Sequence, residues 1–241
     1  MRAMTAGQSL IHSTISPSCY CAWTRWRRLR PQWVPPRLDS PGGQAVPAYL
    51  LLLEATLLYR TKETTAAWRV SEQILAQAPA TELEVIAKTH FLRGLVATEH
   101  ADTPRLREAI AALEHAGSPE LRADHAELRG HLALAERNWE VAALAFDTAA
   151  ELRRTSLDYS SMARALAKAG EAAEQNGHQQ VAAVYYLRAG RSAFQLGRRQ
   201  EAVDWLKRAQ LLARQTGDAH TLQEVRSRLD RLQEDEPDQG R

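Results

Sequence analysis

Residues 163–196 read ARALAKAGEAAEQNGHQQVAAVYYLRAGRSAFQL, and this stretch decides the fold. Its glycines, alanines and one aromatic residue have counterparts 40 residues away. These pairs are Gly130 and Gly170, Ala142 and Ala182, Phe146 and Tyr186, Ala149 and Ala189, and Gly177 and Gly217. A fixed period in this range is typical of stacked helical units, each of which packs on its neighbours. The recurrence therefore predicts a repeat protein rather than one closed globule.

The composition predicts helices throughout the repeat region. The hydrophobic class makes up 44% of the chain, with alanine and leucine far ahead of valine and isoleucine. Alanine and leucine favour helices, whereas strands favour β-branched and aromatic residues. Breaker and capping residues then mark helix ends about every 20 residues. They are Pro47, Lys62–Glu63, Pro79, Thr81 with Glu84 as a capping box, Thr103-Pro104, Ser118-Pro119, Asn138, Asn176-Gly177 and Thr216-Gly217-Asp218.

Helices joined by such short turns must lie antiparallel to their neighbours. We therefore expect an all-α protein, an α-solenoid of about five antiparallel helical hairpins, over residues 44–236. Residues 1–43 lack sustained periodicity and include the run Pro41-Gly42-Gly43, so we expect an irregular basic leader and linker. Residues 237–241 end an acidic stretch and are expected to form a disordered tail.

The repeated residues resemble those of the tetratricopeptide repeat (TPR) family. A TPR unit has a small residue in its first helix, often a turn glycine, and Ala-x-x-x-Phe/Tyr-x-x-Ala in its second helix. Residues 163–196 match well, 123–156 match except that Arg137 replaces the turn glycine, and 48–81, 83–117 and 199–234 match more loosely. The longer spacing implies longer helices or turns than the family's roughly 34-residue unit, and the family's tryptophan and Leu-Gly pair are missing. The resemblance implies a TPR-like right-handed superhelix in which the recurring residues pack adjacent hairpins.

The resemblance also implies where a partner would bind. In TPR proteins the first helix of each unit lines the concave face, so its polar and aromatic residues form a candidate groove. The asparagines with which chaperone-binding TPR domains hold a peptide carboxylate are absent, because Asn138 and Asn176 both lie at turns. We expect a non-catalytic scaffold or adaptor that binds an unidentified protein or peptide. The candidate groove residues are Tyr49, Thr56, Tyr59, Asp124, Glu127, His131, Arg164, Lys168, Glu171, Glu174, Lys207, Arg208 and Arg214.

No sequence motif indicates catalysis or a cofactor. The chain has no Gly-rich phosphate loop, no H-E-x-x-H and no nucleophile elbow. Acids lie beside histidines at Glu99-His100, Glu114-His115 and Asp124-His125, which raises the question of a metal site. However, His125 and His131 are six residues apart, which differs from the i, i+4 spacing that places two ligands on one helical face. We therefore expect that the protein is not an enzyme and that it binds no cofactor and no metal ion.

The net charge of +2 hides an asymmetry. Residues 1–38 hold six arginines and no acid, which leaves 25 basic and 29 acidic residues in 39–241, a net charge of −4. This balance argues against nucleic-acid binding by the repeat region. Both cysteines, Cys19 and Cys21, also lie in the leader, so the repeats need no disulfide.

The leader leaves several interpretations open. Its arginines and tryptophans would suit an anionic membrane surface, and its acid-free, Arg- and Ser-containing composition is typical of a transit peptide. A cysteine before a Pro/Gly linker resembles a lipoprotein anchor, although Ser16-Pro17-Ser18 before Cys19 lacks the apolar residue of such a site. A disordered leader or a start codon assigned too far upstream are further possibilities. We expect a cytoplasmic protein, with a membrane-tethered periplasmic scaffold of the cell envelope as the alternative.

Overall fold

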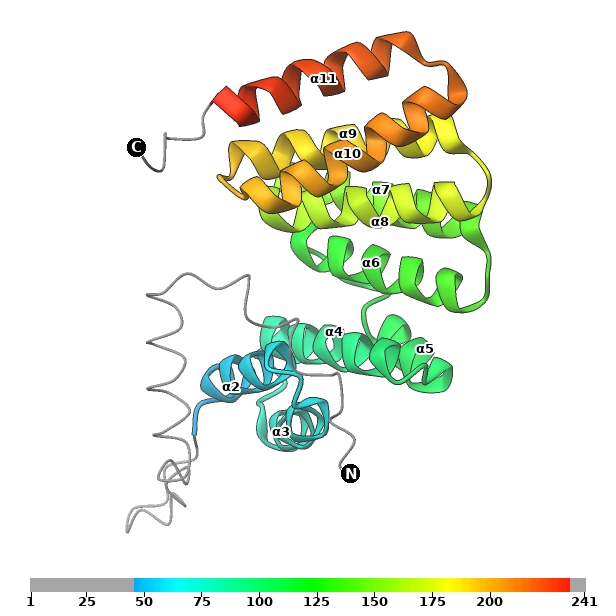
Figure 1. The fold of residues 1–241 in the computed structure, drawn as a ribbon. Helices are drawn as coiled ribbons and strands as arrows, with labels where there is room; N and C mark the ends of the chain where they lie inside the picture. Colours follow the sequence, from blue (N-terminus) through cyan, green and yellow to red (C-terminus); the bar gives the residue numbers. More distant parts are fainter. Residues whose placement is uncertain (1–45, 235–241) are drawn as a thin grey trace, which may run out of the picture. The chain divides into compact units, whose positions relative to one another are not determined.

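The computed structural model describes residues 46–234, and this part of the chain is entirely helical apart from its turns (Figure 1). The predictions for the leader and for the tail lie outside the described residues. Within them, ten helices follow one another with no strand between them. They are α2 (Ala48–Arg60), α3 (Thr64–Gln77), α4 (Leu83–Glu99), α5 (Thr103–Ala112), α6 (Pro119–Ala135), α7 (Trp139–Thr155), α8 (Tyr159–Gln175), α9 (Gln179–Gln195), α10 (Arg199–Thr216) and α11 (Ala219–Glu234).

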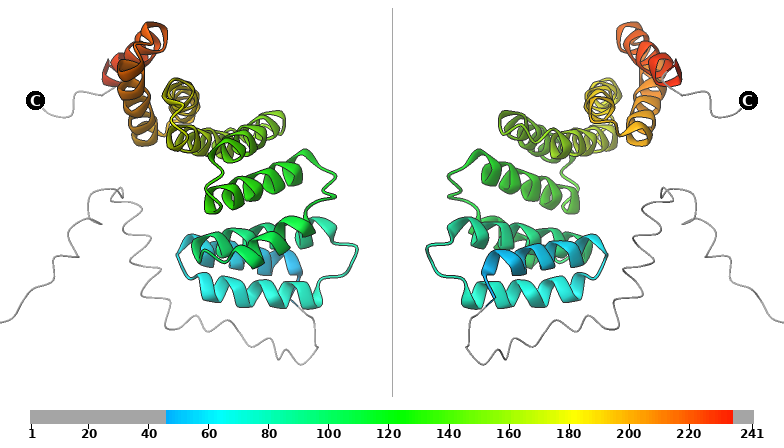
Figure 2. Two further views of the ribbon diagram at one scale, coloured as in Figure 1. Left: turned by 90° about the vertical axis from the view of Figure 1, so that its right-hand side faces the viewer. Right: turned by 90° about the vertical axis from the view of Figure 1, so that its left-hand side faces the viewer.

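Each helix packs mainly on the helices before and after it in the chain. Weaker contacts join helices two apart, such as α2 with α4, α4 with α6, and α9 with α11. Figure 2 shows the same order from two sides, with α2 and α3 at one end of the stack and α10 and α11 at the other. The predicted all-α fold and the α-solenoid of antiparallel helical hairpins are confirmed.

The turns explain the 40-residue period. From α6 onward the helices are 17 or 18 residues long, except for the last, and each turn contains one residue with a left-handed backbone. Two helices with their turns therefore make one 40-residue hairpin. Glycine suits this backbone because it has no Cβ atom, but two of the turns place other residues there. The left-handed residues, spaced 20 apart, are Arg137, Leu157, Gly177, Gly197 and Gly217.

Side chains cap several helices by accepting a hydrogen bond from a backbone N–H in the first turn. Ser118 and Asn138 cap α6 and α7 as the sequence predicts, and Asp158 caps α8. Two predicted caps were wrong. The residue before α5 that accepts the bond is Asp102 rather than Thr103, and α4 begins at Leu83 without a side-chain cap at Thr81. In both cases the helix begins one residue away from the predicted position.

The recurring small and aromatic residues form the core between helices. A Cβ atom added at Gly130 would lie 2.8 Å from the Phe146 ring, and one added at Gly170 would lie 3.2 Å from the Tyr186 ring. Phe146 also shares a buried cluster with Ala169 and Ala172 of α8, the next hairpin. The aromatic residues therefore pack both on the glycine of their own hairpin and on the hairpin that follows. This is the packing role that the repeat pattern predicts for them.

Candidate functional site: the first-helix face

The first helices of the five hairpins are α2, α4, α6, α8 and α10. Ion pairs of side chains on or next to them link α2 to α4, α4 to α6, and α8 to α10. We call the surface that carries these side chains the first-helix face. Lys62 after α2 pairs with Glu99 of α4 at 2.7 Å, and Lys88 of α4 pairs with Asp124 of α6 at 2.7 Å. Further along, Glu174 of α8 forms an ion pair with Arg208 of α10. Of the predicted groove residues, Glu174 and Arg208 thus contact each other across two hairpins, whereas Asp124 contacts Lys88, which was not predicted.

The most buried part of the first-helix face is centred on Asp124. Its side chain is fully buried, although we expected it on the groove surface. Both carboxylate oxygens are paired, one with Lys88 Nζ at 2.7 Å and the other with Arg153 Nη2 at 2.6 Å. Arg153, itself buried, lies on the second helix α7. Asp124 therefore joins α4, α6 and α7 and is not available to a partner.

Arg153 extends the network toward solvent. It pairs with Glu127 at 3.0 Å and with Asp158, the cap of α8, at 3.4 Å. Burial raises the pKa of the Glu127 carboxyl, and the charge of Arg153 opposes this effect. The Glu127 side chain is one-quarter exposed. Solvent therefore reaches it more readily than it reaches Asp124, and less readily than it reaches Asp158.

Tyr59 lies beside the same group of charges. Its hydroxyl is hydrogen-bonded to Glu99, and burial followed by the charge of Glu99 raises the pKa of the phenol. The charges of Glu127 of α6 and Arg164 of α8 also act on this pKa, in opposite directions. Arg164 is exposed, and among residues 46–234 its side chain donates a hydrogen bond only to Ser161 of its own helix, at 3.1 Å.

His131 marks the middle of the first-helix face. Its ring packs edge-on against Phe146, with the ring centroids 5.1 Å apart. Burial, aided by the charge of Lys168 on α8, lowers the pKa of His131 to about 4. The imidazole is therefore neutral at physiological pH and belongs partly to the core.

Beyond His131 the face is exposed and charged. Lys168 pairs with Glu171 at 2.8 Å within α8. The Tyr186 hydroxyl donates a hydrogen bond to Glu174 at 3.3 Å, so Glu174 is held by both Tyr186 and Arg208. The remaining predicted residues are exposed, and they are Tyr49, Thr56, Lys207 and Arg214.

Sequence reasoning missed the residues that organise this face from behind. Lys88 and Arg153 lie 36 and 29 residues from Asp124, and no short motif connects them. Arg153 also lies on a second helix, whereas the family resemblance assigns the groove to first helices. One sequence signal could have found them. A charged residue at a position that helical periodicity assigns to a buried face predicts an oppositely charged partner, because a buried charge requires one.

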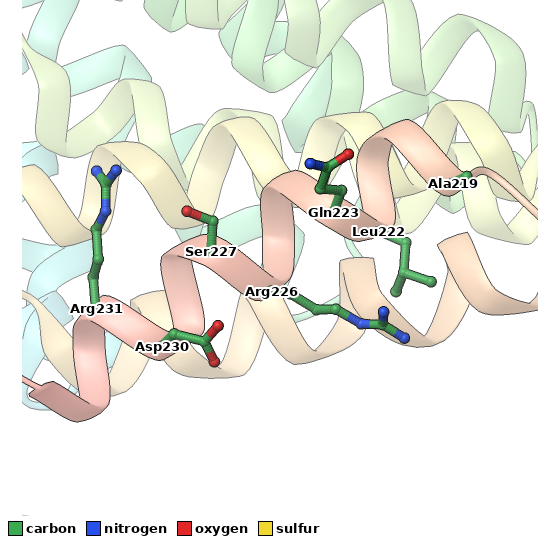
Figure 3. Close-up of a pocket in the computed structure, with 7 residues that line it drawn as sticks. All are labelled: Ala219, Leu222, Gln223, Arg226, Ser227, Asp230 and Arg231. Carbon is green, nitrogen blue, oxygen red and sulfur yellow. The ribbon is translucent and has the colours of Figure 1, made fainter.

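Other features of the described residues give no sign of a chemical centre. No group of three or more His, Cys, Asp or Glu side chains within 46–234 has an arrangement that would hold a metal ion. None of the described helices is long and apolar enough to cross a membrane. A hollow of about 530 Å³ lies on α11, and Figure 3 shows that its lining residues extend along this one helix. They are Ala219, Leu222, Gln223, Arg226, Ser227, Asp230 and Arg231.

Comparisons with known proteins give no functional assignment. No model of a known protein family matches this chain, and a search of curated proteins found no match.

Proposed function

We propose that this chain is a TPR-like α-solenoid that acts as a non-catalytic scaffold and binds a partner protein or peptide on its first-helix face. The TPR-like assignment is supported by Gly130 against Phe146 and by Gly170 against Tyr186, the small-to-aromatic contact that the family pattern implies. The 17-residue helices account for the longer period. Helix pairs of this kind, stacked side by side, create extended surfaces rather than enclosed pockets.

The observation that carries the proposal is the continuity of the first-helix face. Lys62 and Glu99 join the first hairpin to the second by an ion pair, and Lys88 and Asp124 join the second to the third. Glu174 and Arg208 join the fourth hairpin to the last. A partner lying along these helices would therefore meet aromatic, acidic and basic groups in a fixed order. Such an order provides specificity through electrostatic complementarity.

The experiment compares charge reversals on the two sides of the solenoid. The tagged full-length chain would capture proteins from extracts of its source cells, with wild type beside Glu171→Arg on α8. Glu140→Arg on α7 is the matched control, because it makes the same change at an exposed position of a second helix. We expect Glu171→Arg to lose the captured protein and Glu140→Arg to retain it, with both variants showing wild-type circular dichroism. Loss in the α7 variant alone would contradict the proposal.

A further inference from the structure

The exposed side of α10 combines two basic side chains with one apolar side chain. Lys207, Leu211 and Arg214 are separated by four and three residues, so they lie on the same side of the helix. All three are exposed, and Leu211 exposes 44% of its surface. The opposite side of α10 is buried through Leu206, Ala209 and Ala213, so the basic side is free of the solenoid core.

The acids near this side are already engaged by other groups. Glu174 of α8 is bound by Arg208, and Glu201 pairs with Arg198 at 3.5 Å. Asp204, one turn before Lys207, accepts a hydrogen bond from Gln200 at 2.9 Å. The side chains of Lys207 and Arg214 form no hydrogen bond or ion pair with another residue of the described chain. This side therefore presents two basic side chains on either side of an exposed leucine, and neither of them is ion-paired within residues 46–234.

We propose that Lys207, Leu211 and Arg214 bind an acidic segment of a partner protein that places an apolar side chain between its acids. This inference rests on the proposed function and names the chemistry of the partner at the α10 end of the first-helix face. The two cations match acidic side chains, and Leu211 gives an apolar side chain of the partner a surface to cover. A protein segment is favoured over nucleic acid because the exposed leucine has no apolar counterpart on a phosphate backbone.

The test uses the full chain and synthetic probes. A fluorescein-labelled peptide with glutamates on both sides of a central leucine would be titrated by fluorescence anisotropy. Two peptides of the same length serve as controls, one with glutamine in place of every glutamate and one with serine in place of the leucine. We expect the acidic leucine peptide to bind most tightly and to lose affinity as salt is raised, because its charges are exposed.

The double variant Lys207→Gln/Arg214→Gln should weaken binding of the acidic peptide by about threefold to tenfold, because it removes both cations that face the acids of the peptide and exposed ion pairs are individually weak. Arg129→Gln/Arg137→Gln is the matched control, because it removes two exposed cations from the α6 region. Equal affinity of the double variant and wild type, or equal binding of the glutamine peptide, would overturn the inference. Tighter binding of a single-stranded oligonucleotide than of the acidic peptide would overturn it as well.

The outcome also separates this inference from the proposed function. If the acidic peptide does not bind while Glu171→Arg still abolishes capture of the cellular partner, the chemistry assigned to α10 is wrong and the scaffold proposal stands. If Glu171→Arg leaves capture unaffected while the acidic peptide binds to Lys207 and Arg214, the assignment of α10 stands. In that case the part of the first-helix face on α8 has no binding role, and the proposed function is wrong there.

Discussion

The Phe146 ring occupies the space next to Gly130, so closely that a Cβ atom at Gly130 would lie 2.8 Å from it. Phe146 is fully buried between α6 and α8, which leaves its ring little room to move. Gly130→Ala should therefore destabilise the protein by about 1–3 kcal/mol through overpacking, although alanine favours a helix by up to about 1 kcal/mol. Urea denaturation followed by circular dichroism would measure the change.

Gly117→Ala is the control for this prediction. Gly117 lies in the connection between α5 and α6, and a Cβ atom there would meet nothing within 4 Å. We expect its unfolding midpoint to stay near that of wild type. A Gly130→Ala variant as stable as the control would mean that the contact between α6 and α7 is looser than the structure shows.

Leu157, between α7 and α8, should be replaceable by glycine with a gain in stability. Its backbone has φ of 60°, a left-handed value at which a side chain costs about 1–2 kcal/mol. The side chain is 69% exposed, so little packing is lost on its removal. We therefore expect Leu157→Gly to raise the urea midpoint. Leu144→Gly is the matched control, since Leu144 is 67% exposed but lies inside α7, where glycine should lower the midpoint. The same sign of change in both variants would contradict the turn assignment.

Arg153 should be essential for stability, whereas its neighbour Arg154 should not. Arg153→Met would leave Asp124 buried without one of its two cationic partners. Breaking a buried ion pair in this way typically costs about 3–5 kcal/mol. Arg154 is exposed and pairs with Glu151 of its own helix, so Arg154→Met should leave the thermal unfolding midpoint close to that of wild type. Equal melting temperatures of the two variants would show that Asp124 does not depend on Arg153.

His131 should make the protein less stable in mild acid. Its pKa is lowered from 6.5 to about 4, mainly by burial, so the folded state favours the neutral ring. The contribution of the neutral His131 ring to the free energy of unfolding is complete above pH 6.5, the unfolded pKa. It is lost as the pH falls toward 4, by up to about 3 kcal/mol. His131→Gln should therefore show a weaker loss of stability between pH 7 and pH 4 in urea titrations. A pH dependence as steep as that of wild type would place the effect on other groups, such as His90 and His125, whose pKa values burial also lowers.

The packing of the fold was predictable because it repeats. Gly130 and Gly170 have the same role against Phe146 and Tyr186, and that role follows from small size and helical spacing. The turns at Arg137 and Leu157 were harder to predict, because no residue type indicates a left-handed backbone when glycine is absent. Only their spacing of 20 and 40 residues from Gly177 indicates these turns.

The candidate site was predictable only in outline. The register placed Tyr59, Glu127 and Arg164 on first helices, and the structure has them on α2, α6 and α8. The register could not show that Asp124 is buried, because the partners of Asp124 are Lys88 and Arg153, which lie on other helices and far away in the chain. Long-range ion pairs of this kind depend on how hairpins stack, which single-helix periodicity does not specify.

The central claim, that the first-helix face holds a partner, is tested most directly by site-specific photocrosslinking. A benzophenone side chain would be introduced in the full-length chain at Glu171 on α8 or at Leu144 on α7, both exposed. After irradiation with the captured partner, we predict a crosslinked band from position 171 and none from position 144. A crosslink from position 144 with none from position 171 would contradict the account.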